Sequence, residues 1–247
     1  MELVSVISPY FKKKKFIKKT IVSVLNQTYL NFEFIIIYDD AAQDDYKYIK
    51  KISKIDKRIR VIKNSKNLGA GESRNIGIRH SRGKYIAFLY SDDLWHRQKL
   101  EKQLKFMIDN NFGISHSSYK IINQKNEIIG RRIARNFLNY NSLLKSCDIG
   151  LSTVIIKKFL FNNGLKFPKL QTKEDFVLWL KLLKKNNKIM ALNETLVSWR
   201  KLDNSLSSSL LQRLFDGFKV YNKYMNYSYL KSLYLLFCLC LNFLKKK

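Results

Sequence analysis

Residues 83–104 read GKYIAFLYSDDLWHRQKLEKQL, and the pattern changes abruptly in the middle of this stretch. The apolar run at 85–89 is typical of a buried strand, whereas a helical pattern resumes at Arg97. Between the two lie Ser91, Asp92 and Asp93. One interpretation is that Asp93 or a neighbour caps the next helix, because a side-chain oxygen accepts an orphan amide hydrogen at a helix start. The other is that two acids at the carboxyl end of a strand hold a metal and a phosphate, and this stretch by itself leaves both open.

The same alternation of strand and helix patterns extends over the first half of the chain. Strand-like apolar runs lie at 3–8, 33–38, 59–63 and 84–89, and helical patterns lie near 14–27, 44–55, 71–81 and 97–109. This order predicts an α/β fold with a mostly parallel central sheet flanked by helices, whose ligands sit beyond the carboxyl ends of the strands. The polar residues at three of these strand ends are Ser8, Pro9 and Tyr10, then Asp39 and Asp40, then Ser91, Asp92 and Asp93. One shared site is therefore predicted at this edge of the sheet.

The second half, from about residue 113, breaks the alternation. Its patterns predict a hairpin with a turn near 123–126, a helix near 139–146, a strand at 151–157, a helix from Glu174 and a strand near 195–200. We expect this half to extend the sheet and to form the second wall of a cleft. There is no internal repeat or proline- or glycine-rich linker, so no clean domain boundary is expected before residue 200.

The composition is that of a folded and strongly basic protein. The 247 residues carry a net charge of +28, from 47 Lys and Arg against 19 Asp and Glu, and 46% of them are hydrophobic. Such a charge favours an anionic partner, either nucleic acid or an anionic membrane leaflet, although a nucleotide-biased genome also explains a lysine excess. The lysines are spread along the whole chain without a helix-turn-helix, zinc-finger or aromatic RNA-binding signature. Nucleic acid is therefore not expected as a partner.

The cysteines and the N-terminus indicate a cytoplasmic protein. Cys147, Cys238 and Cys240 are odd in number and lack paired metal-binding spacing, so neither a disulfide framework nor a zinc site is expected. The chain enters a strand-like run directly after Glu2, without the basic region, apolar core and cleavage site of a secretory signal. A reducing cytosol is the expected compartment.

Six motifs in order resemble the family 2 glycosyltransferases, over roughly residues 3–210. They are VSVISPY, SVLNQTYLNFEFIIIYDD, NLGAGESRNIGI, YIAFLYSDDLW, KEDFVLWL and LVSWRKLDNSLS. The resemblance implies a single Rossmann-like GT-A domain at 1–210, with a nucleotide-sugar-binding half at 1–112 and an acceptor-binding half at 113–210, followed by a C-terminal helical segment at 211–247. It also implies inverting transfer of a sugar from a nucleotide-diphosphate donor to an acceptor hydroxyl, with Mn²⁺ or Mg²⁺.

The resemblance also assigns roles to the polar residues at the strand ends. Asp92 matches the family's metal-binding aspartate, and Asp93 beside it is a second candidate ligand, since hard cations prefer carboxylate oxygens. Asp40 matches the position that contacts the nucleobase, where a carboxylate can accept the ring N–H of uracil. The donor-binding set implied in this way is Ser8, Pro9, Tyr10, Asp40, Arg74, Ser91, Asp92 and Arg200.

The catalytic base and two arginines come from later motifs. An inverting enzyme needs a carboxylate that takes the acceptor proton opposite the leaving group, and Asp175 in KEDF matches that base. The alternative for Asp175, and still more for Glu174, is an acid in the first turn of a helix, which the helix dipole favours. Arg74 is expected to reach uracil or phosphate, with a solvated helix residue as the alternative. Arg200 resembles the family's late basic residue near the diphosphate.

Two positions depart from the family pattern. Tyr90 stands where an aspartate is usual, which removes one ribose or metal contact, and Ala41 stands where a glycine is usual. Because Asp92 and Asp175 remain, the sequence favours an active glycosyltransferase. The resemblance, together with the basic composition, implies that it uses a UDP-sugar to extend a bacterial lipopolysaccharide, lipooligosaccharide or capsule. The alternatives are a catalytically silent nucleotide-sugar-binding protein, which Tyr90 motivates, and a nucleic-acid-binding protein.

The C-terminal segment is apolar from Leu233 to Leu244, a span shorter than the roughly 20 residues needed to cross a bilayer. Lysines flank it at Lys231 and at 245–247. Residues 227–247 are therefore predicted to form an interfacial helix on an anionic membrane, with a helix packed on the protein or on a second subunit as the alternative. We expect the protein to be peripheral to the cytoplasmic face of the inner membrane.

Overall fold

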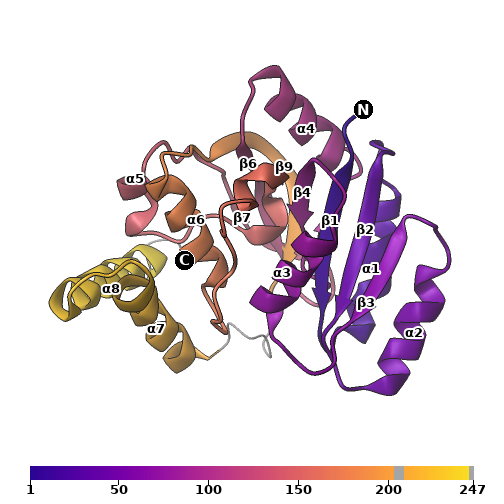
Figure 1. The fold of residues 1–247 in the computed structure, drawn as a ribbon, viewed down its shortest axis with the longest axis horizontal. Helices are drawn as coiled ribbons and strands as arrows, with labels where there is room; N and C mark the ends of the chain where they lie inside the picture. The colour runs from indigo at the N-terminus through magenta and orange to yellow at the C-terminus, as the bar shows by residue number, and fades with distance from the viewer. Residues whose placement is uncertain (203–208, 245–247) are drawn as a thin grey trace.

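The computed structural model describes residues 1–202 and 209–244, in which helices cover a central sheet and the chain ends in a pair of helices at one end of the molecule (Figure 1). The strands are β1 (Val4–Tyr10), β2 (Phe32–Tyr38), β3 (Ile59–Lys63), β4 (Tyr85–Phe88), β5 (Leu94–Trp95), β6 (Ile114–Ile122), β7 (Ile128–Arg132), β8 (Ile155–Lys157) and β9 (Met190–Arg200). The α-helices are α1 (Lys14–Leu25), α2 (Gln43–Ser53), α3 (Ala70–His80), α4 (Lys99–Asp109), α5 (Tyr140–Leu144), α6 (Glu174–Lys184), α7 (Leu210–Lys219) and α8 (Tyr229–Leu244). Shorter helical turns are η1 (Leu151–Thr153), η2 (Lys158–Phe161) and the π-helical η3 (Val220–Tyr224).

The strands form one continuous sheet in the order β3-β2-β1-β4-β8-β6-β9-β5, with β7 paired to β6 outside this path. The pairs β3–β2, β2–β1, β1–β4 and β6–β9 are parallel, while β8, β7 and β5 run antiparallel to their partners. The mostly parallel α/β sheet is thus confirmed, and the second half of the chain extends this sheet as predicted.

The two faces of the sheet fill two separate hydrophobic clusters. Val6 of β1 packs in one cluster with Ile21 of α1 and Leu104 of α4. Its neighbour Ile7 packs in the other cluster with Trp179 of α6. Because successive residues of a strand point to opposite faces, β1 contributes to both clusters. Burial on both faces explains why the central strands are nearly continuous apolar runs in the sequence.

Two details of the second half, and one of the first half, differ from the prediction. The predicted strand at 151–157 is wrong in its first part, because residues 151–153 form η1 and only Ile155–Lys157 pair as β8. Strand β9 begins at Met190 rather than near residue 195, and its register on β6 shifts at an irregularity after Ser117. Strand β5 has two residues, too few for a periodic pattern. Residues 203–208, which belong to the last motif, and 245–247, which carry predicted flanking lysines, lie outside the described residues.

The C-terminal helices are packed against the body of the protein on one side. Leu235 and Leu239 of α8 enter the cluster that contains Tyr221. The two helices also approach closely, since a Cβ added to Gly217 of α7 would lie 2.8 Å from Leu236 Cδ1. Within residues 1–202 and 209–244, no helix is both long and apolar enough to cross a membrane.

Helix α3 approaches β1 so closely that a glycine is required at the contact. A Cβ added to Gly77 would lie 2.4 Å from Cγ2 of Ile7, which is completely buried. Since Ile7 is enclosed by the core, it has little room to move aside. This contact sets the height of α3 above the sheet, and with it the position of Arg74 one turn earlier.

We therefore expect Gly77→Ala to lower the free energy of unfolding by about 1–3 kcal/mol through overpacking, although alanine is the better helix former. Urea denaturation measures this loss. The control is Gly113→Ala, whose new Cβ would make an ordinary contact of 3.5 Å with Leu160. Equal stability of the two variants would contradict the packing argument.

Candidate active site

The two aspartates at the end of β2 have different surroundings. Asp39 accepts hydrogen bonds from Asn64 Nδ2 (2.7 Å) and from the backbone N–H groups of Leu68 and Gly69 (both 2.8 Å). It therefore shapes the loop that leads into α3. Asp40 accepts from the backbone N–H of Lys12 at 3.0 Å, which joins the end of β2 to the loop after β1.

The residues predicted to flank the base lie beside Asp40, at the end of β1. Ser8 is buried, and its hydroxyl has no hydrogen-bond partner within the described part of the chain. Tyr10 stacks on Tyr38 with ring centroids 5.2 Å apart and donates its hydroxyl hydrogen to Asp45 at 2.6 Å. Its ring is thus fixed between neighbouring strands. Pro9 lies between Ser8 and Tyr10 in β1, and the parallel register places it opposite Ile37 of β2.

Asp92 lies at the end of β4 with its carboxylate facing a cation. Its Oδ2 is 3.0 Å from Nζ of Lys13, and 13% of its side chain is exposed. The backbone around it is fixed, because the carbonyl of Ser91 accepts a hydrogen bond from the Thr20 hydroxyl. Lys13 belongs to a run of lysines that the sequence analysis did not connect with Asp92.

Asp93 is a buried anchor rather than the helix cap considered from the sequence. Its Oδ1 accepts from the backbone N–H of Arg200 at 2.8 Å and its Oδ2 from the Ser152 hydroxyl at 2.6 Å. Helix α4 begins later, at Lys99, and has no side-chain cap. Both oxygens of Asp93 are therefore used to join β4 to β9 and to η1. No sequence pattern marked Ser152 as its partner.

Arg200 lies beside the Asp92 backbone, with its guanidinium directed to protein oxygens. Nε donates to the Asp92 carbonyl at 2.9 Å, and the terminal nitrogens donate to the Asn123 carbonyl and the Asn126 side chain, both at 2.8 Å. The guanidinium also lies 4.8 Å from the Phe16 ring. These contacts assign Arg200 to positioning the Asp92 turn.

Arg74 joins the two halves of the chain through a buried ion pair. One of its terminal nitrogens is 2.6 Å from Oε1 of Glu174, and the side chains of Arg74 and Glu174 are 1% and 6% exposed. The second terminal nitrogen is buried without a hydrogen-bond partner in the described part of the chain. The alternative considered for Arg74, a solvated helix residue, is thus wrong, and its contact with the donor stays a prediction. The same helix binds the second half again through Asn75, which exchanges two hydrogen bonds with the Phe167 backbone.

Asp175 follows Glu174 in the first turn of α6 and lies near Tyr90 and Arg74. Burial, together with the neighbouring Glu174 carboxylate, raises the pKa of Asp175 to about 6, against the opposing effect of Arg74. Its Oδ1 accepts from the Phe176 backbone N–H at 2.7 Å, which fixes the carboxylate. A carboxyl group with such a pKa can exchange protons near neutral pH.

The loop before Asp175 is held in an uncommon conformation. Lys173 has a φ of +63°, in the left-handed region that non-glycine residues rarely adopt. Before it, Thr172 donates to Asp216 of α7 from its backbone N–H (2.9 Å) and from its hydroxyl (3.0 Å). Helix α7 therefore contributes to the position of the turn that carries Asp175, a link that the sequence did not reveal.

Tyr90 fills the position where the family usually has aspartate. Its ring packs against the hydrophobic core, and the Arg74 guanidinium lies 5.0 Å from the ring centroid. Its backbone N–H donates to the Ser152 hydroxyl at 3.0 Å. Tyr90 therefore replaces a polar contact with an aromatic wall against which Arg74 is held.

The residues present fit a divalent cation at one position. Within residues 1–202 and 209–244 there is no group of three or more His, Cys, Asp and Glu side chains arranged for a metal. Asp92 already faces a cation, the Lys13 ammonium, and the two oxygens of Asp93 are engaged. Because hard cations prefer carboxylate oxygens, Asp92 is the residue of this site that would hold Mn²⁺ or Mg²⁺.

Sequence comparison connects these residues with known enzymes. The family model described as "Glycosyl transferase family 2" matches residues 5–165. The UDP-Glc:alpha-D-GlcNAc-diphosphoundecaprenol beta-1,3-glucosyltransferase WfgD of Escherichia coli is 39% identical over 214 residues, covering 86% of this chain and 82% of the relative. The putative teichuronic acid biosynthesis glycosyltransferase TuaG of Bacillus subtilis (strain 168) is 33% identical over 246 residues, covering 99% and 97%.

Solved structures share the fold at low sequence identity. The crystal structure of S. aureus TarS 1–349 in complex with UDP-GlcNAc has a TM-score of 0.76 and 18% identity, and the match covers 96% of this chain and 70% of that one. The mannosyltransferase PcManGT from Pyrobaculum calidifontis, in complex with GDP-Man and Mn²⁺, has a TM-score of 0.70 and 13% identity, covering 94% and 69%. The fold is thus of GT-A type. Since the family model spans more than half of the chain and the relatives agree with it, this protein is a glycosyltransferase that belongs to family 2.

Proposed function

We propose that this glycosyltransferase transfers a sugar, with inversion, from a UDP-sugar to a hydroxyl of a lipid-linked bacterial surface glycan, in lipopolysaccharide, lipooligosaccharide or capsule synthesis. The observation that carries the proposal is Asp175, a fixed carboxylate with a raised pKa beside the end of β4. The printed name of WfgD, with UDP-Glc as donor and a diphosphoundecaprenol-linked acceptor, supports the donor and acceptor classes.

In this proposal Asp175 is the general base. The acceptor oxygen bonds to the anomeric carbon as the bond from that carbon to the UDP oxygen breaks, and the acceptor proton passes to Asp175. Oδ1 is occupied by the Phe176 backbone, and no donor of the described chain hydrogen-bonds to Oδ2, so Oδ2 is the oxygen that receives the proton. Arg74 and Glu174 hold the helix that presents this carboxylate.

The donor lies along the carboxyl ends of β1, β2 and β4 in this proposal. Asp40 accepts from the uracil ring, next to Ser8, Pro9 and Tyr10, and the lysines after β1 lie near the diphosphate. A divalent cation held by Asp92, when bound, stabilises the negative charge that develops on the leaving diphosphate. Lys13, which faces Asp92 at 3.0 Å, contributes positive charge at the same place.

We place the protein at the cytoplasmic face of the membrane, where lipid-linked acceptors are found. The basic composition and the exposed apolar residues of α8 support this location.

The base assignment predicts that Asp175→Asn lowers the single-turnover transfer rate by about a hundred- to ten-thousand-fold, because the amide cannot take the proton. UDP binding is expected to stay nearly unchanged. The wild-type rate should rise with pH through about 6 and then level off, since only the deprotonated carboxylate accepts a proton. Rapid-quench transfer assays with saturating donor and acceptor measure the transfer rate of the variant and the pH profile of the wild type.

The matched control is Asp109→Asn, the same substitution on an exposed part of α4. If the Asp175→Asn enzyme transfers the sugar as fast as this control, Asp175 is not the general base.

The metal assignment predicts that Asp92→Ala weakens UDP binding in the presence of Mn²⁺ by tenfold or more, because the cation loses its protein ligand. Without metal, the same variant is expected to bind UDP at least as well as the wild type, since a negative charge near the diphosphate is removed. Isothermal titration calorimetry with and without Mn²⁺ gives both affinities. An unchanged metal-dependent affinity in Asp92→Ala would contradict the role of Asp92.

A further inference from the structure

Helix α8 has two apolar faces, and the protein covers only one of them. Leu235 and Leu239 point into the core, whereas an opposite stripe is exposed. Leu230 and Phe237 in this stripe are 82% and 61% exposed. The outward stripe comprises Leu230, Leu233, Tyr234, Phe237, Leu241 and Leu244. Spacings of three and four residues place all of them on one side of the helix.

Helix α7 adds exposed apolar side chains with cations at their edges. Leu211 and Phe215 are largely exposed. The Lys219 ammonium lies 4.0 Å from the Phe215 ring centroid, and the Arg213 guanidinium lies 4.4 Å from that of Phe243 in α8. Long basic side chains that lie along aromatic rings are typical of segments at a membrane surface, where the apolar part is buried and the charge stays in water.

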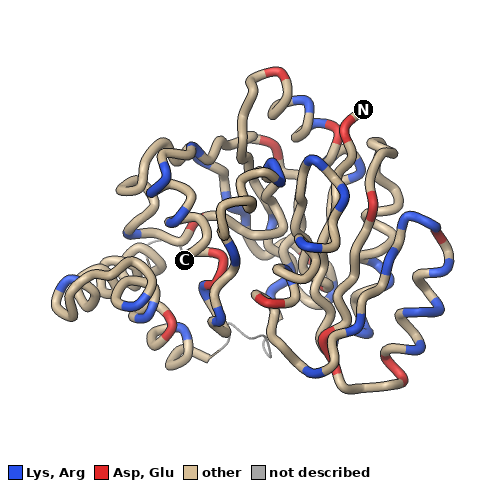
Figure 2. The backbone as a smooth tube through the Cα atoms, viewed as in Figure 1, with Lys and Arg blue, Asp and Glu red and all other residues tan. Residues whose placement is uncertain are grey.

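The local charge is of one sign. Residues 217–247 contain no aspartate or glutamate but include Lys219, Lys223, Lys231, Lys245, Lys246 and Lys247. Figure 2 shows basic residues over the whole fold, so charge alone does not select a face of the molecule. The combination of this charge with an exposed apolar stripe selects the C-terminal helix pair, residues 210–244.

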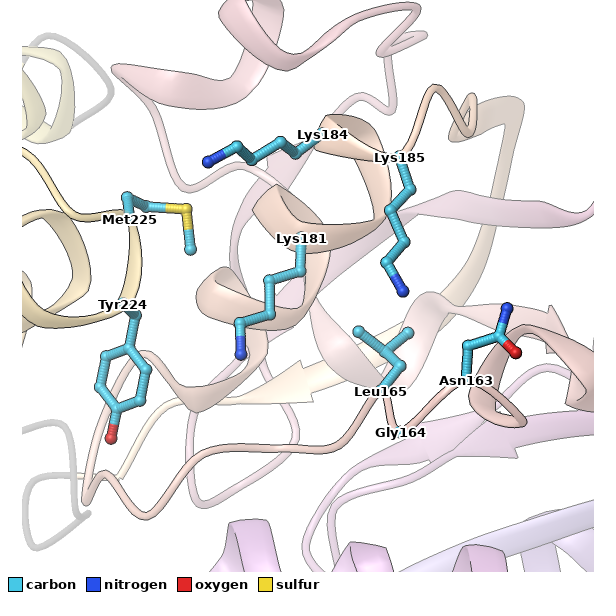
Figure 3. A pocket seen from close by; sticks show the side chains of 8 residues that line it. All are labelled: Asn163, Gly164, Leu165, Lys181, Lys184, Lys185, Tyr224 and Met225. Atoms are coloured by element: carbon cyan, nitrogen blue, oxygen red, sulfur yellow. The ribbon is translucent and has the colours of Figure 1, made fainter.

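A basic cavity adjoins this helix pair. It has a volume of ≈ 310 Å³, and η3, which connects α7 to α8, contributes Tyr224 to its wall. Lys181 and Lys184 of α6, and Lys185 directly after it, line this cavity (Figure 3). No carboxylate lines the cavity, and none in the described part of the chain pairs with these lysines. Burial, together with the positive charges of Lys166 and Lys185, lowers the pKa of Lys181 from its usual value.

We propose that the C-terminal helix pair docks on an anionic lipid leaflet, with the outward stripe of α8 at the acyl boundary and a lipid headgroup phosphate in the lysine cavity. A phosphate is a compact anion that cationic side chains lining one cavity can bind. The inference rests on the proposed function only for its placement at the cytoplasmic leaflet. It assigns the docking surface and the headgroup site to named residues.

A second copy of the chain is the other occupant that an apolar stripe can bind. Two copies that met through this stripe would bring two acid-free lysine segments together, which is unfavourable. An anionic leaflet offers the opposite charge and also covers the apolar residues. The charge therefore favours the lipid surface over a dimer.

The test is sedimentation of the full-length protein with vesicles of phosphatidylcholine, with and without phosphatidylglycerol. Deleting α8 would expose the core, because Leu235 and Leu239 are buried, so substitutions on the outward stripe are the better variants. Leu233→Gln/Phe237→Gln tests the stripe. Its control is Leu30→Gln/Ile133→Gln, where the residues are 67% and 73% exposed elsewhere.

The cavity is tested by Lys184→Glu/Lys185→Glu. The matched control, Lys50→Glu/Lys51→Glu, makes the same charge change on α2, which lies at the opposite end of the molecule from α8 (Figure 1). We expect wild-type protein to bind the vesicles that contain phosphatidylglycerol. We expect the affinity of each test variant for these vesicles to be lower by about tenfold or more. The two controls are expected to stay within about threefold of the wild type.

Three results would overturn the inference: wild-type protein that ignores anionic vesicles, controls that lose as much binding as the test variants, or a solution dimer that Leu233→Gln/Phe237→Gln dissociates. Analytical ultracentrifugation detects the last of these. Donor hydrolysis without vesicles separates this inference from the proposed function. If the stripe variant hydrolyses donor normally but does not bind the vesicles, docking is confirmed without reference to the acceptor. If the wild-type protein does not hydrolyse donor, that result counts against the proposed function alone.

Discussion

The buried ion pair between Arg74 and Glu174 is the constraint on which the arrangement of the active site depends. Both side chains are removed from water, so each charge must keep its partner, and loss of either one typically costs about 3–5 kcal/mol. The pair joins α3 of the first half to α6 of the second, and Asp175 is the next residue of α6. The close contact of α3 with β1 at Gly77 sets the position of Arg74, so Asp175 is positioned relative to the same sheet that carries Asp40 and Asp92.

How much of this site can be predicted from the sequence depends on how far apart along the chain the interacting residues lie. The strand ends, and thus Asp40 and Asp92, were predicted because alternation along the chain fixes which edge of a parallel sheet they share. The hydrogen bonds of Asp93 could not be predicted, because its partners, Ser152 and Arg200, are 59 and 107 residues away. Arg74 has the polar appearance of a surface residue, and its burial depends on Glu174, 100 residues later. Periodicity reports which face of an element is apolar, but it does not report which distant polar side chains pair.

The C-terminal helices are less separate from the catalytic domain than the predicted boundary near residue 210 implies. Asp216 of α7 binds Thr172, directly before the left-handed Lys173 and the α6 turn that carries Asp175. Two lysines of the proposed headgroup site, Lys181 and Lys184, lie on α6 as well. One helix thus carries the proposed base, Asp175, at its N-terminal end and two of the lysines proposed to bind the headgroup at its C-terminal end. A docked helix pair would therefore present the cleft to a lipid-linked acceptor in a defined orientation.

Burial and the neighbouring Glu174 carboxylate together raise the pKa of Asp175, and the pH dependence of single-turnover transfer in Glu174→Gln tests most directly whether Asp175 accepts the proton. Glutamine keeps the shape and an oxygen that can accept from Arg74, but it removes the negative charge that raises the pKa of Asp175. The account predicts that the acidic limb of the rate profile, near pH 6 in the wild type, moves to lower pH in Glu174→Gln. A limb that stays in place, or that moves to higher pH in a folded variant, would contradict it.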